Sequence, residues 1–333
     1  MRTIVITGCA GLLGSHLTRH LIKKGYRVIG IDNLSGGYAD YLPSHPSFNF
    51  HAFDLSVREA KYKLNNIFQQ EKPTACYHFA AYAAEGLSPF IRYYNYTNNI
   101  LASVNIINQC INHDTKMIFT SSMAVYGDQI APFTEDMPSS PVDPYGVSKY
   151  AVEMDIKIAA EQHNMRYTIV RPHNIVGIYQ NIWDRYRNVV GIFIRKVLDG
   201  EPVTIYGDGE QTRAFSDVKY YMDAFEKMID NHNGQTYNVG ADKAYTINQL
   251  ANTVELIASE NGYTAEKKYM QPRHEVKHAH CDHTKAKTDL GFSDETNLES
   301  MVDEMFKWAI REPKRKQKNM NYEIERGMYD YWK

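Results

Sequence analysis

The stretch TIVITGCAGLLGSHL (residues 3–17) places Gly8, Gly11 and Gly14 where a β-branched run gives way to a helical pattern. Glycines at this spacing permit a tight turn, close approach of the backbone to a diphosphate, and close packing of helix on strand. The helix N-terminus adds free N–H groups and a partial positive charge. An ordinary glycine-rich turn has the same spacing, so the next strand has to decide between the two.

The second strand ends in an acid. The run RVIGID (27–32) finishes at Asp32, close to the ~20-residue spacing expected after the glycines for a carboxylate that binds adenosine ribose hydroxyls. A carboxylate here would repel the 2′-phosphate of NADP, and no arginine follows in DNLSGG, so the pattern predicts NAD. Asp54 ends the third strand, where it either contacts the adenine or caps a helix.

Alternating elements organise the first half. Short apolar runs at 3–7, 27–32, 48–53, 75–80, 116–121 and 167–171 are separated mostly by stretches of helical period, such as 12–25 and 98–113. Continuous apolar strands are typical of a parallel sheet with helices on both faces. Right-handed crossovers then predict an α/β protein with a Rossmann-type doubly wound parallel sheet.

The second half is less regular. Residues 173–213 are loop-rich around a helix at 189–200, a strand is expected at 235–240, and Thr246 with Gln249 forms a capping box before a helix. We expect an NAD-binding domain from residues 1–172 and a returning segment at about 214–243. Residues 173–213 and 244–333 would form a smaller C-terminal α/β domain for the substrate.

Composition narrows the function classes. The 333 residues are 43% hydrophobic and 23% charged with a net charge of −2, which predicts a soluble globular protein with no footprint for nucleic acid or an anionic membrane. No apolar run approaches the ~20 residues of a membrane span, and the N-terminus reads as a strand rather than a signal peptide. Widely spaced cysteines without a CxxC pair predict reduced thiols and a cytoplasmic location: Cys9, Cys76, Cys110 and Cys281.

The stretch DPYGVSKY (143–150) carries the candidate chemistry. Asp143 can cap a helix that puts Tyr145 and Lys149 one turn apart on one face. Ser122, in FTSSMAVYG, follows the preceding strand at the sheet edge where ligands bind. A tyrosine base needs a pKa drop of about 3 units, roughly 4 kcal/mol, of which an ammonium at ~6 Å supplies roughly 3 kcal/mol. An oxidised nicotinamide ring would supply the rest.

These motifs resemble one family over nearly the whole chain. TGxxGxxG, the acid after the second strand, HFAA, SSxAVYG and YxxxK resemble the extended short-chain dehydrogenase/reductases, and within them the NAD-dependent sugar-nucleotide 4-epimerases of the UDP-glucose 4-epimerase group. RPHN, GEPVTIYGDGEQTRAFSDV and CDHTKAKTDLGF are similar to landmarks of the second half.

The resemblance implies a role for particular residues. NAD would be bound by Gly8, Gly11, Leu12, Leu13, Gly14, Asp32, Asn33, Asp54, Leu55, Ala80, Ala81, Tyr145 and Lys149. Catalysis would fall to Ser122, Tyr145 and Lys149. The sugar nucleotide would contact Ser122, Tyr145, Asn174, Asn188, Val189, Arg213, Arg273 and Ala279, with the two arginines on its diphosphate. A small residue at Ala279, three positions before the DxxKA landmark, would admit N-acetylated sugars.

The implied reaction is inversion at C4 of a nucleotide sugar, with UDP as the family's nucleotide. Tyr145 would take the C4 hydroxyl proton while hydride passes to NAD, and the keto sugar would turn before hydride returns to its other face. Met123 and Ala124 follow Ser122, so the acidic pair of the 4,6-dehydratases, the cysteine of the 3,5-epimerases and the glutamate of the decarboxylases are missing. An NAD-dependent reductase or dehydrogenase and a non-catalytic NAD-binding regulator remain alternatives, although a regulator would be expected to lose the catalytic residues.

Three further patterns complete the expectations. The segment HEVKHAHCDH (274–283) shows no tetrahedral set of ligands, so we expect no metal. Arg185 and Arg187 either face water, which we favour, or favour an acidic sugar. Helices at about 98–111 and 145–161 correspond to those that form a four-helix dimer interface in relatives, which predicts a homodimer; the alternative is that their faces only pack on the sheet.

Overall fold

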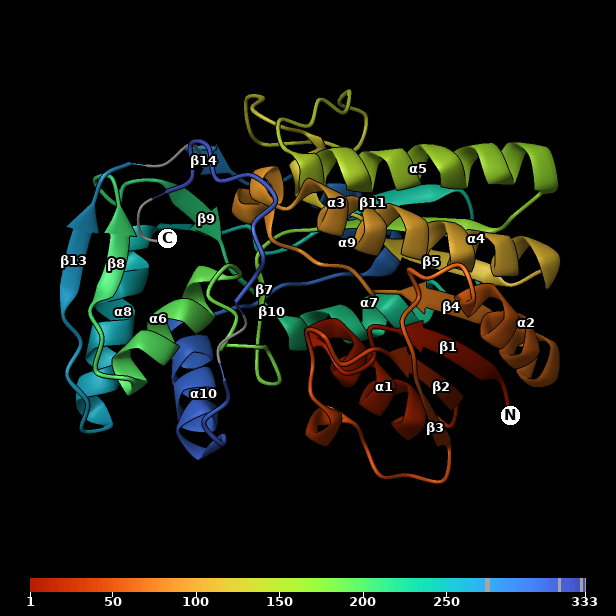
Figure 1. Ribbon diagram of the computed structural model, residues 1–333, viewed down its shortest axis with the longest axis horizontal. Helices are drawn as coiled ribbons and strands as arrows, with labels where there is room; N and C mark the ends of the chain where they lie inside the picture. The colour runs from red at the N-terminus through yellow and green to blue at the C-terminus, as the bar shows by residue number, and fades with distance from the viewer. Residues whose placement is uncertain (273–275, 317–318, 330–331, 333) are drawn as a thin grey trace.

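The protein is built on a seven-stranded parallel sheet, described by a computed structural model for residues 1–272, 276–316, 319–329 and 332. The strand order is β11-β6-β5-β4-β1-β2-β3, so the chain runs outward from β1 in both directions (Figure 1). This confirms the doubly wound fold, and every predicted strand forms within two residues of its expected ends. The strands are β1 (Thr3–Thr7), β2 (Arg27–Asp32), β3 (Phe48–Ala52), β4 (Ala75–His78), β5 (Lys116–Thr120), β6 (Tyr167–Pro172) and β11 (Gln235–Val239).

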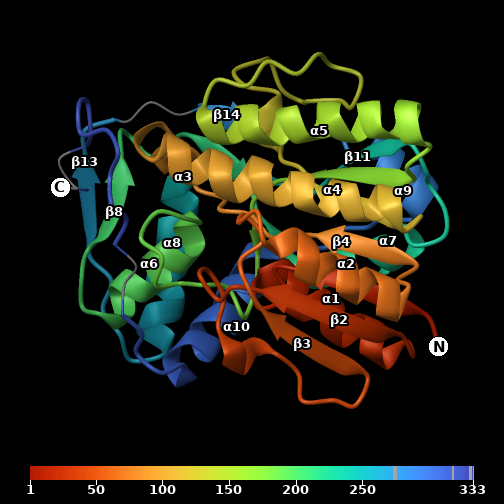
Figure 2. The same ribbon diagram turned by 45° about the vertical axis from the view of Figure 1, so that its right-hand side comes forward.

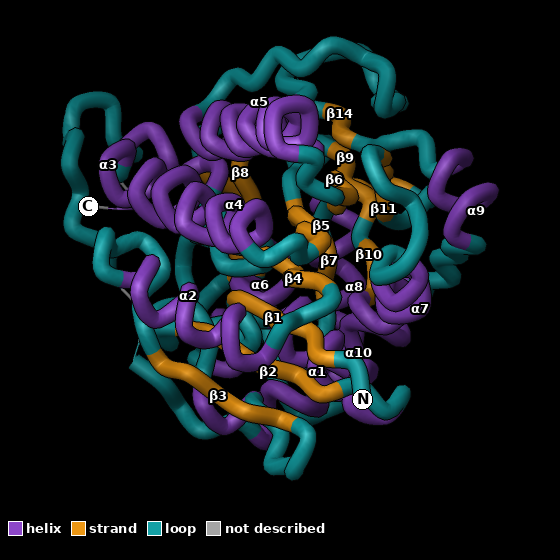
Figure 3. Tube along the Cα trace, turned by 90° about the vertical axis from the view of Figure 1, so that its right-hand side faces the viewer, coloured by secondary structure: helices purple, strands orange, loops and turns teal. Residues whose placement is uncertain are grey.

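Helices cover both faces of this sheet, because alternate strand residues point to opposite sides. Ile4 and Ile6 pack with residues of α1 (Leu12–Lys23), α7 (Met222–Lys227) and α9 (Thr284–Leu290). Val5 packs instead with residues of α2 (Ala60–Glu71), α4 (Ala102–Asn112) and α5 (Pro144–His163). Figures 2 and 3 show α2, α4 and α5 together on one side of the strands. The carboxyl ends of the strands are thereby left open to the rest of the chain.

The helix predicted from residue 98 is interrupted by a wider turn. The short α3 (Arg92–Tyr96) continues into a π-helical turn, η3 (Thr97–Leu101), before α4 begins. Within this turn the buried Asn99 amide accepts a hydrogen bond from the Tyr82 N–H (2.8 Å) and donates one to the Tyr82 carbonyl (3.2 Å). Single π turns often occur at functional sites, and this one fixes the segment that leaves β4.

The second half packs around its own apolar cluster, in which α6 (Val189–Leu198), α8 (Ile247–Glu260) and α10 (Leu298–Arg311) meet. The capping box of Thr246 and Gln249 is present at the start of α8, as predicted. Small sheets flank these helices: β13 (Lys267–Met270) with β8 (Val203–Tyr206), β12 (Ala244–Thr246) with β9 (Thr212–Ala214) and β14 (His278–Ala279), and β10 (Ser216–Asp217) with β7 (Ile175–Val176).

Short helical turns complete the connections, at η1 (Ala39–Tyr41), η2 (Glu85–Phe90), η4 (Met123–Val125) and η5 (Val218–Tyr221). The C-terminal segment returns to η2, where Met320, Met328 and Trp332 pack with Phe90 and Tyr186. None of the helices in the described ranges is both long enough and apolar enough to cross a membrane.

Candidate active site

A cavity of about 380 Å³ lies at the carboxyl edge of the sheet. The glycine turn after β1 lines one end, and the starts of α5 and β7 line the other. A second, larger cavity of about 1140 Å³ adjoins it toward α6, and Tyr145, Asn174 and Arg213 line both. The two cavities together offer space for a dinucleotide and a second ligand that meet at Tyr145.

The glycine turn has the geometry of a phosphate-binding loop. Gly8 has a φ of +69°, and an added Cβ would stand 2.8 Å from the Ala80 nitrogen. A Cβ at Gly14 would stand 2.2 Å from the Gly8 carbonyl oxygen, so a side chain there would push α1 off the turn. Gly11 caps α1, whose first N–H groups have no acceptor within the helix and meet the cavity. This cradle suits the diphosphate of NAD.

Asp32 lies where the sequence predicts a ribose-binding carboxylate. Its Oδ2 accepts a hydrogen bond from the Ala10 N–H (3.0 Å) and its Oδ1 accepts one from Leu34 (2.7 Å). Burial raises the pKa of Asp32, and these backbone donors oppose the rise by stabilising the carboxylate. The carboxylate is therefore held at the cavity edge by the backbone of the glycine turn and of the next loop.

Asp54 does not cap a helix. Helix α2 begins only at Ala60, and Asp54 instead accepts hydrogen bonds from Ser56 N–H (2.7 Å) and from Asn33 Nδ2 (3.1 Å). The capping alternative is therefore wrong, because a further turn separates β3 from α2. Asp54 lines the first cavity beside Asn33, together with Leu12, Leu13, Leu55, Ala80 and Ala81 from the predicted cofactor set.

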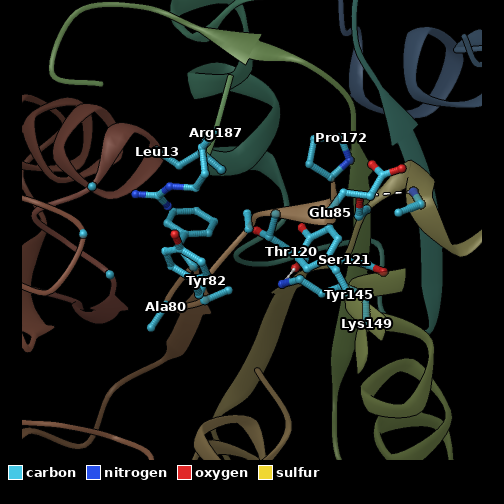
Figure 4. A pocket seen from close by; sticks show the side chains of 18 of the residues that line it. Leu13, Ala80, Tyr82, Glu85, Thr120, Ser121, Tyr145, Lys149, Pro172 and Arg187 are labelled. Carbon is cyan, nitrogen blue, oxygen red and sulfur yellow. Dashed lines mark hydrogen bonds between the residues drawn. The ribbon is translucent and has the colours of Figure 1, made fainter. Parts of the chain in front are cut away.

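The start of α5 is built as predicted. Asp143 caps the helix by accepting a hydrogen bond from Gly146 N–H (2.9 Å), and Pro144 opens the first turn. Lys149 donates to the Thr120 carbonyl (2.8 Å), and its Nζ lies 5.8 Å from the centre of the Tyr145 ring. Figure 4 shows Tyr145 and Lys149 lying together below Thr120 and Ser121.

Burial acts against the charged forms of both α5 residues. It raises the pKa of Tyr145, a rise that a hydrogen bond with Ser122 partly opposes. It lowers the pKa of Lys149 to about 7, with Glu153 acting in the opposite direction. In the chain alone burial therefore keeps the pKa of Tyr145 above its ordinary value, and the lowering expected from lysine is not seen without ligands. Ligands that bring positive charge or hydrogen-bond donors have to complete the base.

Several polar atoms on the cavity wall have no hydrogen-bond partner among the residues that the structure describes. They are Thr120 Oγ1, Ser121 Oγ, Asp143 Oδ2 and Asn174 Nδ2. Thr120 and Ser121 were not in the predicted set, although they directly precede Ser122 at the end of β5, which is a usable signal. Unpaired buried polar groups are costly, so these atoms indicate a polar ligand at this end of the cavity.

The predicted sugar-nucleotide residues line the cavities in different ways. Asn174 has a φ of +43° and lines both, whereas the Asn188 side chain caps α6 through Val190 N–H (3.1 Å). Val189 opens α6 and lines the larger cavity. Arg213 donates to the carbonyls of Thr212 and Lys277, and buried Ala279 lines the first cavity. Arg273 lies outside the described residues.

The arginines of the 185–187 segment do not simply face water. The Arg187 side chain is 21% exposed, and its Nε donates to Asp184 Oδ2 at 3.0 Å. Arg185 is half-buried and lines only the larger cavity. The interpretation of a charged loop facing water is therefore wrong for Arg187, whose charge is paired with a buried carboxylate inside the cavity wall.

The histidines of the 274–283 segment point to separate partners. His278 contacts Thr212 Oγ1 (2.9 Å), while His283 contacts both His173 (2.8 Å) and Asp242 (3.0 Å). His274 lies outside the described residues. The His278 and His283 side chains thus tie strands and loops together, whereas the buried His280 Nδ1 has no hydrogen-bond partner among the described residues.

The geometry and the family comparison agree on the class of protein. The NAD dependent epimerase/dehydratase family model matches residues 4–240, and the chain belongs to this family, whose cofactor is NAD. The UDP-glucose 4-epimerase of Mycolicibacterium smegmatis is 30% identical over 90% of this chain and 95% of its own length.

Two solved structures show the same architecture. UDP-glucose 4-epimerase from Thermotoga maritima, with UDP-glucose, is 30% identical with a TM-score of 0.85, covering 93% of this chain and 99% of that one. UDP-N-acetylglucosamine 4-epimerase from Methanobrevibacter ruminantium, in complex with UDP-N-acetylmuramic acid, is 30% identical with a TM-score of 0.84, covering 93% and 98%.

Proposed function

We propose that this chain is an NAD-dependent 4-epimerase of a nucleotide sugar, with UDP as the nucleotide. One observation carries the proposal: the cavity that begins at the phosphate-binding turn passes Tyr145 and Lys149 and continues into a second cavity. An enzyme that oxidises and reduces the same sugar needs this junction, because cofactor and substrate must meet at one base. The similar epimerases named above support the reaction and the UDP moiety.

Each residue at the junction has a role in the proposed mechanism. Tyr145 takes the proton of the C4 hydroxyl and later returns it. Ser122 orients that hydroxyl through the hydrogen bond it shares with Tyr145. Lys149, held by the Thr120 carbonyl, stabilises the phenolate and the nicotinamide ribose. NAD bound along the glycine turn would supply the redox chemistry, as the acceptor and then the donor of the C4 hydride.

The substrate side follows from the residues of the second half. Asn174, Asn188, Val189, Arg213 and Arg273 are proposed to hold the sugar nucleotide, with the arginines on its diphosphate. Ala279 leaves room beside the sugar, which favours N-acetylated hexoses among the substrates. In this proposal residues 1–172 and about 214–243 bind NAD, while residues 173–213 and 244–333 bind the sugar nucleotide.

We also propose a cytoplasmic homodimer. Apolar side chains remain exposed where the helices of a four-helix interface would meet: Leu101 is 50% exposed, Met154 47% and Ile158 46%. Covering them is favourable by roughly 25 cal/mol per Å² of apolar surface. Sedimentation of wild type and of Met154→Glu would test this, since a dimer should dissociate in the variant. Four buried, unpaired cysteines support the reducing compartment.

The reaction is tested by incubation with UDP-glucose, UDP-N-acetylglucosamine and UDP-glucuronate, without added NAD, followed by separation of the 4-epimers. Conversion of any one shows an epimerase that retains its cofactor. A specific outcome favours the rival reductase: no conversion, together with stoichiometric consumption of added NADH by a keto-sugar nucleotide. If the protein binds NAD but catalyses neither reaction, the non-catalytic regulator is the alternative that remains.

A further inference from the structure

Arg187 is a cationic side chain in the cavity wall that the family resemblance leaves without a role. It comes from the connection between β7 and α6 and lines both cavities. Its guanidinium lies 5.1 Å from the centre of the Tyr82 ring, on the segment that leaves β4. In Figure 4 it extends toward the side of the pocket where Leu13, at the start of α1, is labelled.

The guanidinium lies against the loop that follows β2. A Cβ at Gly36 would stand 3.2 Å from Arg187 Nη2, so the missing side chain makes room for the arginine. The neighbouring Gly37 lies against the phosphate-binding turn, because a Cβ there would stand 2.2 Å from the Ala10 carbonyl oxygen. Arg187 therefore reaches the cavity at its diphosphate end.

The arginine is fixed in this position by a buried carboxylate. Asp184, whose side chain is fully buried, accepts from Arg187 Nε at 3.0 Å and from Tyr186 N–H at 3.0 Å. The bond to Asp184 uses Nε, and within the described ranges the two terminal nitrogens make no hydrogen bond, which leaves them as donors toward the cavity. An arginine held this way loses little side-chain freedom when it binds an anion.

The loop that carries Arg187 is tied to the same glycine loop by a second contact. Asn181 donates to the Gly36 carbonyl (3.1 Å) and accepts from the Tyr38 hydroxyl (3.1 Å). The loop with Asn181 and Arg187 and the loop with Gly36 and Tyr38 thus pack against each other next to the start of α1, along a line that we call the seam. An anion bound beneath this seam would contact both sides of it.

We propose that Arg187 binds the diphosphate of the bound dinucleotide, as a clamp opposite the helix N-terminus. The helix end offers only a partial positive charge, about half an elementary charge, to a group that carries two negative charges. The Arg187 guanidinium adds two parallel donors suited to phosphate oxygens, and its positive charge is shared between Asp184 and a bound anion. The position beside Gly36 assigns Arg187 to the cofactor rather than to the sugar nucleotide, whose diphosphate the resemblance places on Arg213.

The clamp explains how the cofactor stays bound between the two half-reactions. This role of Arg187 rests on the proposed function in one respect: an epimerase must keep NAD bound while the keto sugar turns. Because Arg187 belongs to the segment that ends in Asn188 and Val189, cofactor binding would also set the wall of the substrate cavity. The inference therefore predicts that losing this one charge weakens NAD binding.

The test compares Arg187→Gln with Arg185→Gln, a matched control on the same loop that lines only the larger cavity. NAD content is measured after purification and dialysis, and NAD affinity by titration calorimetry of the cofactor-depleted protein. We expect Arg187→Gln to weaken NAD binding by about 10- to 100-fold, the range for a charge-assisted hydrogen bond. Arg185→Gln should bind NAD like wild type.

A second variant keeps the test decisive if Arg187→Gln does not fold. Arg187→Lys keeps the charge but loses the planar fork, so we expect an NAD affinity between those of wild type and the Gln variant. Unchanged NAD affinity in whichever variant folds, with a raised KM for the nucleotide sugar, would overturn the inference and place Arg187 on the substrate. Because NAD affinity is measured without turnover, a wild type that holds NAD yet does not epimerise would refute the proposed function alone.

Discussion

The two walls of the active-site cavity are built in different ways. The cofactor wall consists of strand ends and helix starts: Asp32 ends a parallel strand, and Gly8 and Ser122 come one and two residues after one. The facing wall runs through 173–188, where Asn174, Tyr179 and Asn188 all have positive φ values of 43°, 64° and 50°. Such values are strained for residues other than glycine, so this wall depends on its side-chain hydrogen bonds rather than on regular structure.

The difference separates chemistry from recognition. Proton transfer needs Tyr145 and Lys149 in one place, and a helix packed on a sheet keeps them there. Recognition of a particular sugar can change with a loop while the base stays fixed. Mutations in the cofactor wall should therefore reduce every activity of the enzyme, while mutations in the facing wall should change which substrates are used.

The largest effect on activity is expected from a mutation in the cofactor wall. Tyr145→Phe should lower kcat by about 10²- to 10⁴-fold for every nucleotide sugar that is converted, because the general base is lost. NAD content should stay close to that of wild type, since the ring remains. Steady-state kinetics and cofactor extraction check both points, with Tyr150→Phe on the same helix as the control. Substantial residual activity in Tyr145→Phe would remove the tyrosine from the mechanism.

The buried lysine on this wall makes stability depend on pH. Burial lowers the Lys149 pKa from 10.5 to about 7, so the folded chain binds fewer protons than the unfolded chain between these values. Wild-type stability should therefore rise with pH across this window relative to Lys149→Met, which cannot titrate. The variant's advantage below pH 7 should be on the order of 5 kcal/mol at most.

Urea unfolding of the cofactor-free proteins at pH 6 and pH 9 measures this difference. Lys157→Met, an exposed position on the same helix, should show no such change with pH. If the Lys149→Met advantage is the same at both pH values, Lys149 does not release its proton in this window and the low pKa is wrong.

The glycine turn should tolerate no side chain. Gly14→Ala places a methyl group 2.2 Å from the Gly8 carbonyl oxygen, so the backbone must move, at a cost of about 1–3 kcal/mol. NAD should be lost with it. Gly86→Ala is the matched control, because the added carbon meets only Trp332 at 3.9 Å. The midpoint temperature of thermal unfolding and the NAD content should fall for Gly14→Ala and stay unchanged for Gly86→Ala. Equal values for the two variants would contradict the packing argument.

The cofactor wall could be predicted from the sequence to a much greater extent than the facing wall. Gly14, Asp32 and Tyr145 could be located because strand, turn and helix patterns are local, and each pattern fixes where the next side chain points. The position of Arg187 could not be predicted, since it depends on Asp184 and on a contact with Gly36 far away in the chain. The opposing pKa shifts of Tyr145 and Lys149 were also missed, because spacing along a helix carries no information on burial.

The smallest and most selective effect is expected on the irregular wall, at Ala279. This buried residue lines the first cavity and pairs in register with Arg213, so one strand pair would place both a diphosphate ligand and the group beside the sugar. Ala279→Tyr should fill the space for an N-acetyl group, which lowers kcat/KM for UDP-N-acetylglucosamine by about 10- to 100-fold while UDP-glucose changes by less than about 3-fold. Ala279→Ser, which stays small, should leave the ratio of the two substrates near that of wild type. An equal loss for both sugars in Ala279→Tyr would mean that the tyrosine disturbs the shared cavity, and that this wall does not select the sugar at position 279.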